Sequence, residues 1–433
     1  MQISSHAHRL APVIHHAQQL HQLFMVEREF VRTVTTLIPR LGTPEIKYML
    51  CQHAWESTQH AQFLLGRGRE MNGFGNPDPV PTAFRRIFEE ALRAPTPLAT
   101  LQGFYQVLKP ALLAAYQHYL ATTSALGDWP TTHLLTEFVL DEVRHVREAD
   151  VFLAHGAPCP TWNQHIQAAL AAQGGWLAQD PQPLPEEYVW FVDQQVYRHP
   201  TTPARDYPTG WTAFGDDPQE DAICASWLTD PATDAGIIRV MVYVWLMNEM
   251  DAVDYLATVF YDTPDVTFDV HHDLARHLWD ESRHSQFGFR MLPRLGIDLH
   301  TVEQQVGLYD VLVQLSPAER YALMTMEFEA RSFGTKAIVM DRVHELDDFE
   351  SDTLLAFDRN DEQNHVRFGH RWLPTLLASV GETRPIPDFL AAARDHFAEV
   401  ERTTTIVAHT LPREDRLTAA KIRAQVQRHQ STL

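Results

Sequence analysis

Two stretches, LARHLWDESRHSQF at residues 274–287 and NDEQNHVR at residues 360–367, decide the fold. Each contains an Asp-Glu pair and, three residues after the glutamate, a histidine. Side chains three apart on an α-helix project from one face, so Glu281 and His284 form a chelating pair, and the second stretch repeats it. Apolar residues surround both pairs, which argues against solvated helix faces. The two stretches predict metal-binding pairs on two buried helices.

The second pair is Glu362 with His365, and each pair has a glutamate upstream on another predicted helix. Glu249 precedes Glu281 by 32 residues, and Glu329 precedes Glu362 by 33. A bundle with one Glu on each of two helices and Glu-x-x-His on the other two is the ligand set of ferritin-like two-metal carboxylate proteins. Carboxylates bridge two cations, and imidazole suits iron. The predicted metal ligands, and catalytic residues, are Glu249, Glu281, His284, Glu329, Glu362 and His365.

Two aspartates directly precede ligand glutamates and are expected to support the ligand histidines. We expect Asp280 to bond His365 and Asp361 to bond His284, because a carboxylate on the far nitrogen of a ligand imidazole fixes its tautomer.

Two further residues leave alternatives open. His277 lies four residues before Glu281 on the same face, and is either a third imidazole ligand or a core histidine. Glu327 is an alternative to Glu329. Glu329 is preferred because its distance in sequence to Glu362 is closer to the distance from Glu249 to Glu281.

The metal-binding motifs belong to an internal repeat. LCQHAWESTQHAQF (50–63) aligns with 274–287 at an offset of 224, and LDEVRHVR (140–147) aligns with 360–367 at an offset of 220. The simplest explanation is a tandem duplication of one bundle. A Pro-rich stretch separates the copies. The predicted organisation is an N-terminal ferritin-like bundle, a linker, a C-terminal ferritin-like bundle and a helical tail, at 1–171, 172–221, 222–382 and 383–433.

Helical periodicity dominates the chain and predicts an all-α protein of two tandem four-helix bundles. Apolar residues recur three and four apart in several long segments. Ser316 before Pro317, with Glu319 behind it, is typical of a helix N-terminus. The clearest predicted helices in the second copy cover 241–261, 270–292, 318–343 and 351–377.

The first copy matches the ligand pattern incompletely. Ser57 stands where the second copy has Glu281, and Lys109 stands where it has Glu329. Two carboxylates are therefore missing, and an ammonium is expected where a metal would lie. Glu56, four residues before a retained histidine, is a candidate substitute ligand. The copy is either a decayed site kept as scaffold or a single-metal remnant built from Glu29, His60, Glu142 and His145.

Composition limits the classes of function. The 433 residues carry 56 acidic and 35 basic side chains, for a net charge of −21, which disfavours nucleic acid and anionic membranes as partners. Three widely separated cysteines form no CxxC motif, which disfavours thiolate metal sites and a disulfide framework. No secretory signal or apolar run of about 20 residues is present, so a cytoplasmic location is expected.

The pattern of Glu249, DExxH at 280–284, Glu329 and DExxH at 361–365 resembles ferritin-like non-haem di-iron oxidases and oxygenases. Within them it is most similar to the p-aminobenzoate N-oxygenase type. That family carries its additional histidine on the last helix, whereas His277 belongs to the second, and a tandem degenerate copy is not its usual layout. The resemblance implies two iron ions, O2 as co-substrate, and oxidation of an amine or a C–H bond through a peroxo or higher-valent di-iron species.

The sequence supports one function best and leaves others open. The leading hypothesis is an O2-dependent di-iron monooxygenase or oxidase acting on a small molecule, with an external electron donor such as a reductase or ferredoxin. Alternatives are an iron-binding or iron-oxidising protein without an organic substrate, a metal-dependent hydrolase or manganese-loaded variant, and a structural or partner-binding protein with a vestigial site. A homodimer is left open. Aromatic residues that could line an apolar pocket are Tyr243, Trp245, Tyr255, Phe328 and Phe333.

Overall fold

The computed structural model describes residues 13–71, 80, 82–177, 181–214, 217–405 and 409–430. These residues are predominantly helical, which confirms the all-α class. The strands assigned among them are β1 (Thr209–Gly210) and β2 (Gln304–Gln305), which pair in parallel. Across the described ranges, no helix combines the length and the apolar character that a bilayer crossing requires.

The chain divides into two compact units. Unit 1 comprises residues 1–37 and 53–198, and unit 2 comprises residues 38–52 and 199–433. The stretch 172–221, which we expected to be a separate linker, is instead shared between the units, with the division after Arg198. The short segment 38–52, expected in the first bundle, belongs to unit 2 because Lys47 and Tyr48 contact side chains there, Asp254 and Ser285.

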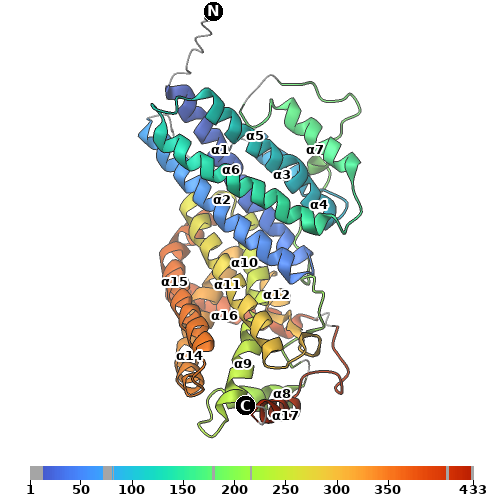
Figure 1. Cartoon of the computed structure of the whole chain (residues 1–433), viewed down its shortest axis with the longest axis vertical. Helices are drawn as coiled ribbons and strands as arrows, with labels where there is room; N and C mark the ends of the chain where they lie inside the picture. Colours follow the sequence, from blue (N-terminus) through green and yellow to red (C-terminus); the bar gives the residue numbers. More distant parts are fainter. Residues whose placement is uncertain are drawn as a thin grey trace, which may run out of the picture. The chain divides into compact units, whose positions relative to one another are not determined.

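Unit 1 is formed by helices from the first part of the chain. Helix α5 packs against α6 and α1, and α3 packs against α1 and α7 (Figure 1). Helix α2 begins in unit 2 and continues in unit 1 from His53 onward. In chain order the elements are α1 (Val13–Val34), η1 (Thr35–Arg40), α2 (Pro44–Glu70), α3 (Thr82–Ala91), α4 (Pro97–Gly103), η2 (Phe104–Leu108), α5 (Lys109–Thr122), α6 (Trp129–Leu153), α7 (Pro160–Ala172) and η3 (Phe191–Asp193).

Unit 2 is built around long helices that contact one another side by side. Helix α11 packs against α9, α10 and α15, and α14 packs against α9 and α15 (Figure 1). The remaining elements follow in chain order: α8 (Pro218–Trp227), α9 (Ala235–Asn248), α10 (Met250–Asp262), α11 (Phe268–Arg294), η4 (Leu299–Thr301), α12 (Gly307–Leu312), α13 (Pro317–Leu323), η5 (Met324–Phe328), α14 (Glu329–His344), α15 (Phe349–Ser379), α16 (Ile386–Thr403) and α17 (Ala419–Gln430).

The predicted helix start at Ser316 is confirmed. Ser316 accepts a hydrogen bond from the backbone N–H of Glu319, and the Glu319 carboxylate accepts one from the backbone N–H of Ser316 at 2.9 Å. This capping box satisfies two N–H groups that a helix end leaves without partners.

Two irregularities were not predicted, and both lie at ligand positions. Helix α9 ends at Asn248 and α10 begins at Met250, so Glu249 occupies a break. The π-helical turn η5 directly precedes Glu329, and a matching π-turn, η2, directly precedes Lys109 in unit 1. A π-turn is an uncommon helix irregularity that is frequent at functional sites, and here it occurs at the same place in both copies.

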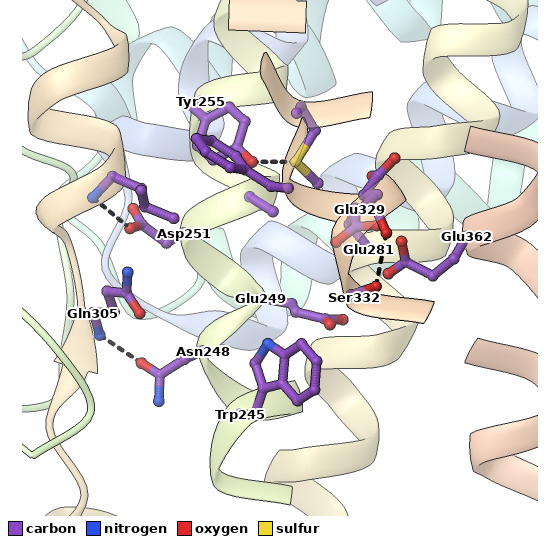
Figure 2. Close-up of a pocket in the computed structure, with 14 residues that line it drawn as sticks. Trp245, Asn248, Glu249, Asp251, Tyr255, Glu281, Gln305, Glu329, Ser332 and Glu362 are labelled. Atoms are coloured by element: carbon purple, nitrogen blue, oxygen red, sulfur yellow. Dashed lines mark hydrogen bonds between the residues drawn. The ribbon is translucent and has the colours of Figure 1, made fainter. Parts of the chain in front are cut away.

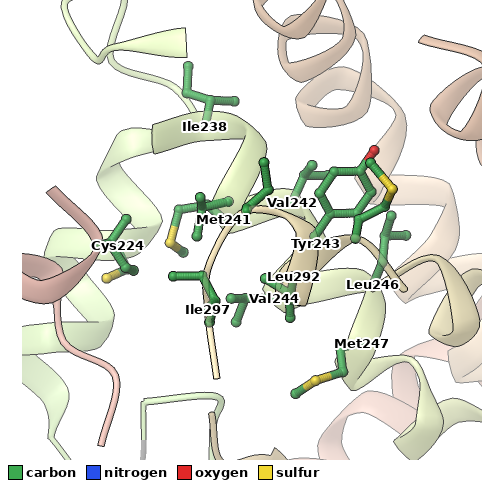
Figure 3. Packing of buried hydrophobic residues seen from close by; sticks show 14 of the residues in the cluster. Cys224, Ile238, Met241, Val242, Tyr243, Val244, Leu246, Met247, Leu292 and Ile297 are labelled. Atoms are coloured by element: carbon green, nitrogen blue, oxygen red, sulfur yellow. The ribbon is translucent and has the colours of Figure 1, made fainter. Parts of the chain in front are cut away.

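A buried apolar cluster fixes α9 within unit 2 (Figure 3). Met241, Val244 and Leu246 of α9 pack with Leu292 at the end of α11, and Ile422 of the C-terminal helix joins the same cluster. Helices α9 and α11 approach each other closely at Gly288, where an added Cβ would lie 2.6 Å from the Met247 Cα. This close approach lies one turn beyond His284, and so sets the spacing of two ligand-bearing helices.

Candidate metal centre

Unit 2 brings eight potential ligands together as two adjoining groups. The ligand atoms of each group lie within 4.8 Å of one another. The structure thus assembles all six predicted residues and His277, whose role the sequence left open, and it adds Asp358. The first group is His277, Glu281, Glu329 and His365, and the second is Glu249, His284, Asp358 and Glu362.

Helical spacing explains why two helices supply six of the eight ligands. Helix α11 carries ligands at 277, 281 and 284, and α15 carries them at 358, 362 and 365. Both sets follow the spacing i, i+4, i+7, which is one continuous helix face. Asp358 was missed in the sequence analysis, although it stands four residues before its glutamate, as His277 does. The remaining two ligands come from the break after α9 and from the first residue of α14.

Glu281 belongs to the first group and also lies beside His284 of the second. Its Oε1 is 3.2 Å from the Nδ1 of His365 and 3.8 Å from the Nδ1 of His284. The Nδ1 of His284 is also 3.1 Å from Glu249, and the Nδ1 of His365 is 3.4 Å from Glu329. A carboxylate in this position can bridge two cations, one beside each histidine.

The predicted outer hydrogen bonds are confirmed. The Nε2 of His365 lies 3.4 Å from Asp280, and the Nε2 of His284 lies 3.4 Å from Asp361. Arg283 donates to both aspartates, with 2.6 Å to Asp361. With Nε2 held on the outside, each imidazole presents Nδ1 to the centre, which is the orientation that a metal ligand needs.

The centre contains buried polar atoms that a cation would satisfy. The Nδ1 atoms of His284 and His365 make no hydrogen bond with any described residue, and neither does one oxygen on each of the four glutamates, Glu249, Glu281, Glu329 and Glu362. Buried polar atoms without hydrogen bonds are uncommon and costly. Because these atoms converge on two small volumes and have the chemistry of metal ligands, the donor set fits a pair of divalent cations.

The pKa values of the carboxylates in the centre also fit a cation there. Burial, and then the negative charge of Glu249, raises the pKa of Glu281 to about 7. Burial also raises the pKa of Glu362 well above its ordinary value. For Glu329 the effect of burial is outweighed by His277 and His365, which hold its pKa at about 2. Crowded carboxylates of this kind are stabilised in the ionised form by a bound cation.

The structure shows where His277 and Glu327, whose roles the sequence left open, are located. His277 is buried, its Nε2 is 2.8 Å from Glu329, and its ring stacks on His365 with centroids 3.8 Å apart. Burial, and then the neighbouring His365, lowers the pKa of His277 to about 4, so its imidazole is neutral, as metal binding requires. Glu327 instead forms an ion pair with Arg394 at 3.0 Å, so the choice of Glu329 agrees with the geometry.

A buried lysine in the second group was not anticipated. The Nζ of Lys336 donates to Asp358 at 2.6 Å and to Glu362 at 2.7 Å, and lies 3.9 Å from Glu249. Lys336 follows Glu329 by seven residues on α14, so both face the centre. Periodicity places this residue on the inner face, but nothing in the sequence indicates that a cation is accommodated there.

A pocket with a cavity volume of about 130 Å³ opens onto the centre from one side. All four glutamates line it, whereas the three histidines do not. Figure 2 shows Glu281, Glu329 and Glu362 directed toward one another, with Trp245 below Glu249. Of the five aromatic residues proposed for a pocket, Trp245, Tyr255 and Phe328 line it, and Tyr243 and Phe333 do not.

Unit 1 holds the counterpart of this centre, with an ammonium inside it. Glu27, His60 and Glu142 form one potential ligand group. The Nζ of Lys109 donates to Glu142 at 2.6 Å and to Ser57 at 3.0 Å, and it lies 3.6 Å from the Glu27 carboxylate. The expectation that an ammonium stands at the metal position therefore agrees with the structure.

The predicted ligand Glu29 of unit 1 is corrected. Glu29 is not in the group, because its carboxylate accepts hydrogen bonds from Arg32 at 2.8 Å and 3.0 Å; Glu27 takes its place. Helix α1 is unbroken, whereas unit 2 has an interruption at Glu249. The glutamate of α1 that faces the group, Glu27, therefore lies two residues before Glu29, the residue that aligns with Glu249.

Glu56 does not substitute as a ligand either. It lies 2.7 Å from the Nε2 of His145, which repeats the contact of Asp280 with His365. The Nε2 of His60 lies 3.2 Å from Asp141, which repeats the contact of His284 with Asp361. The outer carboxylate–histidine pairs are thus present in both units. His145 lies beside the group, 3.6 Å from Glu142, but is not one of its three members.

The chain was compared with known families and proteins. Residues 238–423 match a family model described as "Protein of unknown function (DUF455)". The matched segment contains all eight potential ligands of unit 2 and Lys336, and it excludes unit 1. No curated protein and no solved structure matches the chain.

Proposed function

We propose that unit 2 is a ferritin-like four-helix bundle that binds two iron ions and uses O2 to oxidise a small organic molecule. The bundle would comprise α9 with α10, α11, α13 to α14, and α15. The observation that carries this proposal is the pocket bordered by all four glutamates and by none of the histidines. A molecule in that pocket would meet the open side of the metal positions, where ligand exchange can take place.

The chain's own residues would prepare the site in three ways. The Asp280 and Asp361 carboxylates hold the two ligand imidazoles in one orientation. Glu281 lies where it can join the two positions. Tyr255, which donates to Met324, helps close the pocket against water. The bound iron ions would pass electrons to O2, and an external donor such as a reductase or ferredoxin would have to restore them in each turnover.

The pocket lining favours a small apolar or amine substrate. Trp245, Tyr255, Leu308, Met324 and Phe328 supply apolar surface, and the charged lining residues are all acidic. Asp251 is itself a lining residue, and its oxygens accept the backbone N–H groups of Leu308 and Tyr309 at 3.1 Å and 3.2 Å. With no lysine or arginine among the lining residues described, no side chain there would pair with an anionic substrate.

The test is anaerobic loading of the full chain with Fe²⁺, followed by exposure to O2. We expect two iron ions per chain, O2 consumption and a new absorption band. Glu281→Ala should lose at least one ion, because Glu281 adjoins both histidines. If the wild-type chain binds no metal, and Glu281→Ala melts like wild type, the proposal is refuted.

A second variant separates oxidation of an organic substrate from oxidation of iron alone. Ala252 lines the pocket but offers no ligand atom. Ala252→Trp should fill the pocket, leave two iron ions bound, and abolish product formation from a panel of small aromatic amines supplied with a chemical reductant. If it abolishes product while O2 is still consumed by the iron, a substrate pocket is supported. Iron oxidation by wild type with no product from any amine would favour the alternative without an organic substrate.

A further inference from the structure

The two metal positions in unit 2 carry different groups. The position formed by His277, Glu281, Glu329 and His365 offers two imidazoles and two carboxylates. The position formed by Glu249, His284, Asp358 and Glu362 offers one imidazole and three carboxylates, and in addition contains the Lys336 ammonium. Counted formally, the lysine offsets the third carboxylate, so the second position gains no advantage in charge over the first.

Lys336 also competes for the ligand oxygens themselves. Its Nζ lies 2.6 Å from Asp358 Oδ1 and 2.7 Å from Glu362 Oε1. A divalent cation needs carboxylate oxygens at roughly 2.0–2.2 Å, so a cation on either of those oxygens would stand close to the ammonium and be repelled by it. Lys336 is buried and only 4% exposed, so its movement away from the carboxylates is restricted by the surrounding helices.

The first position has no such competitor. Among the described residues, the side chains paired with its two carboxylates, Glu281 and Glu329, are histidines, with no lysine or arginine. The stacked rings of His277 and His365 hold two imidazoles beside Glu329. Neither Lys336 nor Asp358 has a charged counterpart in unit 1. The residues 220 positions earlier are Tyr116 and Phe138, both without charge at neutral pH. Tyr116 donates to Glu27 at 2.6 Å.

We propose that the two positions fill in order: the His277, Glu281, Glu329 and His365 position takes the first divalent cation, and Lys336 weakens binding of the second. This inference rests on the two-metal centre proposed above. It gives Lys336 a definite role as the residue that makes the two positions unequal. A chain with one ion bound is therefore a distinct, populated state, in which Lys336 still neutralises the second position.

The test is a titration of the metal-free full chain with Co²⁺, followed by equilibrium dialysis and visible absorption. Wild type should bind one Co²⁺ tightly and a second at least about tenfold more weakly, because like charges repel strongly at short range in a buried site. Lys336→Met should raise the second affinity by at least about tenfold and leave the first within about threefold. His277→Gln should instead weaken the first.

Lys47→Met is the matched control. Lys47 is another buried lysine of unit 2, paired with Asp254 at 2.7 Å, but it is outside the metal centre. It should leave both Co²⁺ affinities unchanged. Lys336→Gln provides a second variant if the methionine variant does not fold.

Three outcomes overturn the inference. Two equal affinities in wild type would refute ordered filling while leaving the two-metal centre intact. An unchanged ratio in a folded Lys336 variant would show that the lysine is not the cause. A wild-type chain that binds no Co²⁺ would refute the two-metal centre together with the inference.

Discussion

Lys109→Met in unit 1 tests whether a buried ammonium replaces a metal there. The substitution removes a positive charge and keeps an unbranched side chain of similar length. It leaves Glu142 without its 2.6 Å partner and Glu27 without a cation at 3.6 Å. Both carboxylates are fully buried, so they cannot recover their hydration.

The expected loss of stability can be estimated. Removing one partner of a buried ion pair costs about 3–5 kcal/mol, because the remaining charge is left uncompensated. For a unit of this size, each kcal/mol corresponds to a change of about 2–4 °C in Tm. The transition of unit 1 in the full chain should therefore fall by about 6–20 °C.

The same variant should gain a metal site. Glu27, His60 and Glu142 would form a three-ligand group that suits Zn²⁺. Zinc at 100 times its Kd would restore about 2.7 kcal/mol. The assay is differential scanning calorimetry of the full chain with and without zinc, together with metal analysis. Because unit 2 also has potential zinc ligands, the variant is compared with wild type at the same zinc concentration, and should bind one additional ion.

The control is the double variant Lys109→Met with Glu142→Gln. It lacks one of the two carboxylates that lose the ammonium, the one that Lys109 contacts at 2.6 Å. It should therefore be more stable than Lys109→Met without zinc, and should gain no stability from zinc in unit 1. A Lys109→Met chain that melts like wild type, or that melts lower but binds no additional zinc, would refute the reasoning.

Three other predictions concern unit 2. Gly288→Ala should lower the free energy of unfolding by about 1–3 kcal/mol, measured by urea denaturation, because its Cβ would lie 2.6 Å from the Met247 Cα; an unchanged midpoint would contradict the close approach. Asp280→Asn should weaken metal binding about 10–100-fold in a Co²⁺ titration, since it bonds His365, and unchanged affinity would remove its supporting role. Burial, and then the nearby Arg205, lowers the pKa of Lys47 from 10.5 to about 8. Between pH 8 and 10.5 the unfolded chain therefore binds more protons at Lys47 than the folded chain does. The free energy of unfolding of wild type, relative to that of Lys47→Met, should rise by about 3 kcal/mol over this range. A difference between the two free energies that does not change with pH would contradict the lowered pKa.

The sequence predicted the ligands best where helix geometry alone decides their direction. Glu281 and His284 share a face because they are three residues apart on a helix, and no detail of packing is needed to know this. The pairing of Asp280 and Asp361 with the opposite histidines came instead from the way carboxylates support ligand histidines in related metal sites, and the hydrogen bonds confirm it. Glu329 was chosen over its neighbour by spacing alone.

Prediction failed where the helix is irregular or a charge is unexpected. Glu27 was missed because a simple offset assumes that both copies keep the same helix register, whereas only unit 2 breaks its helix at Glu249. Lys336 and Asp358 were missed because periodicity identifies an inner face but not which charges can neutralise one another on it. The π-turns before Glu329 and Lys109 have no sequence signal that we recognise.

The outer carboxylate–histidine pairs have a consequence for how the protein gains and loses metal. They are formed in unit 2, and also in unit 1, where Lys109 occupies the metal position. In unit 1 they therefore hold the imidazoles beside an ammonium in place of a metal. A chain stripped of its ions should keep its ligands aligned, so that reloading is a local binding event and requires no refolding of the helices around it.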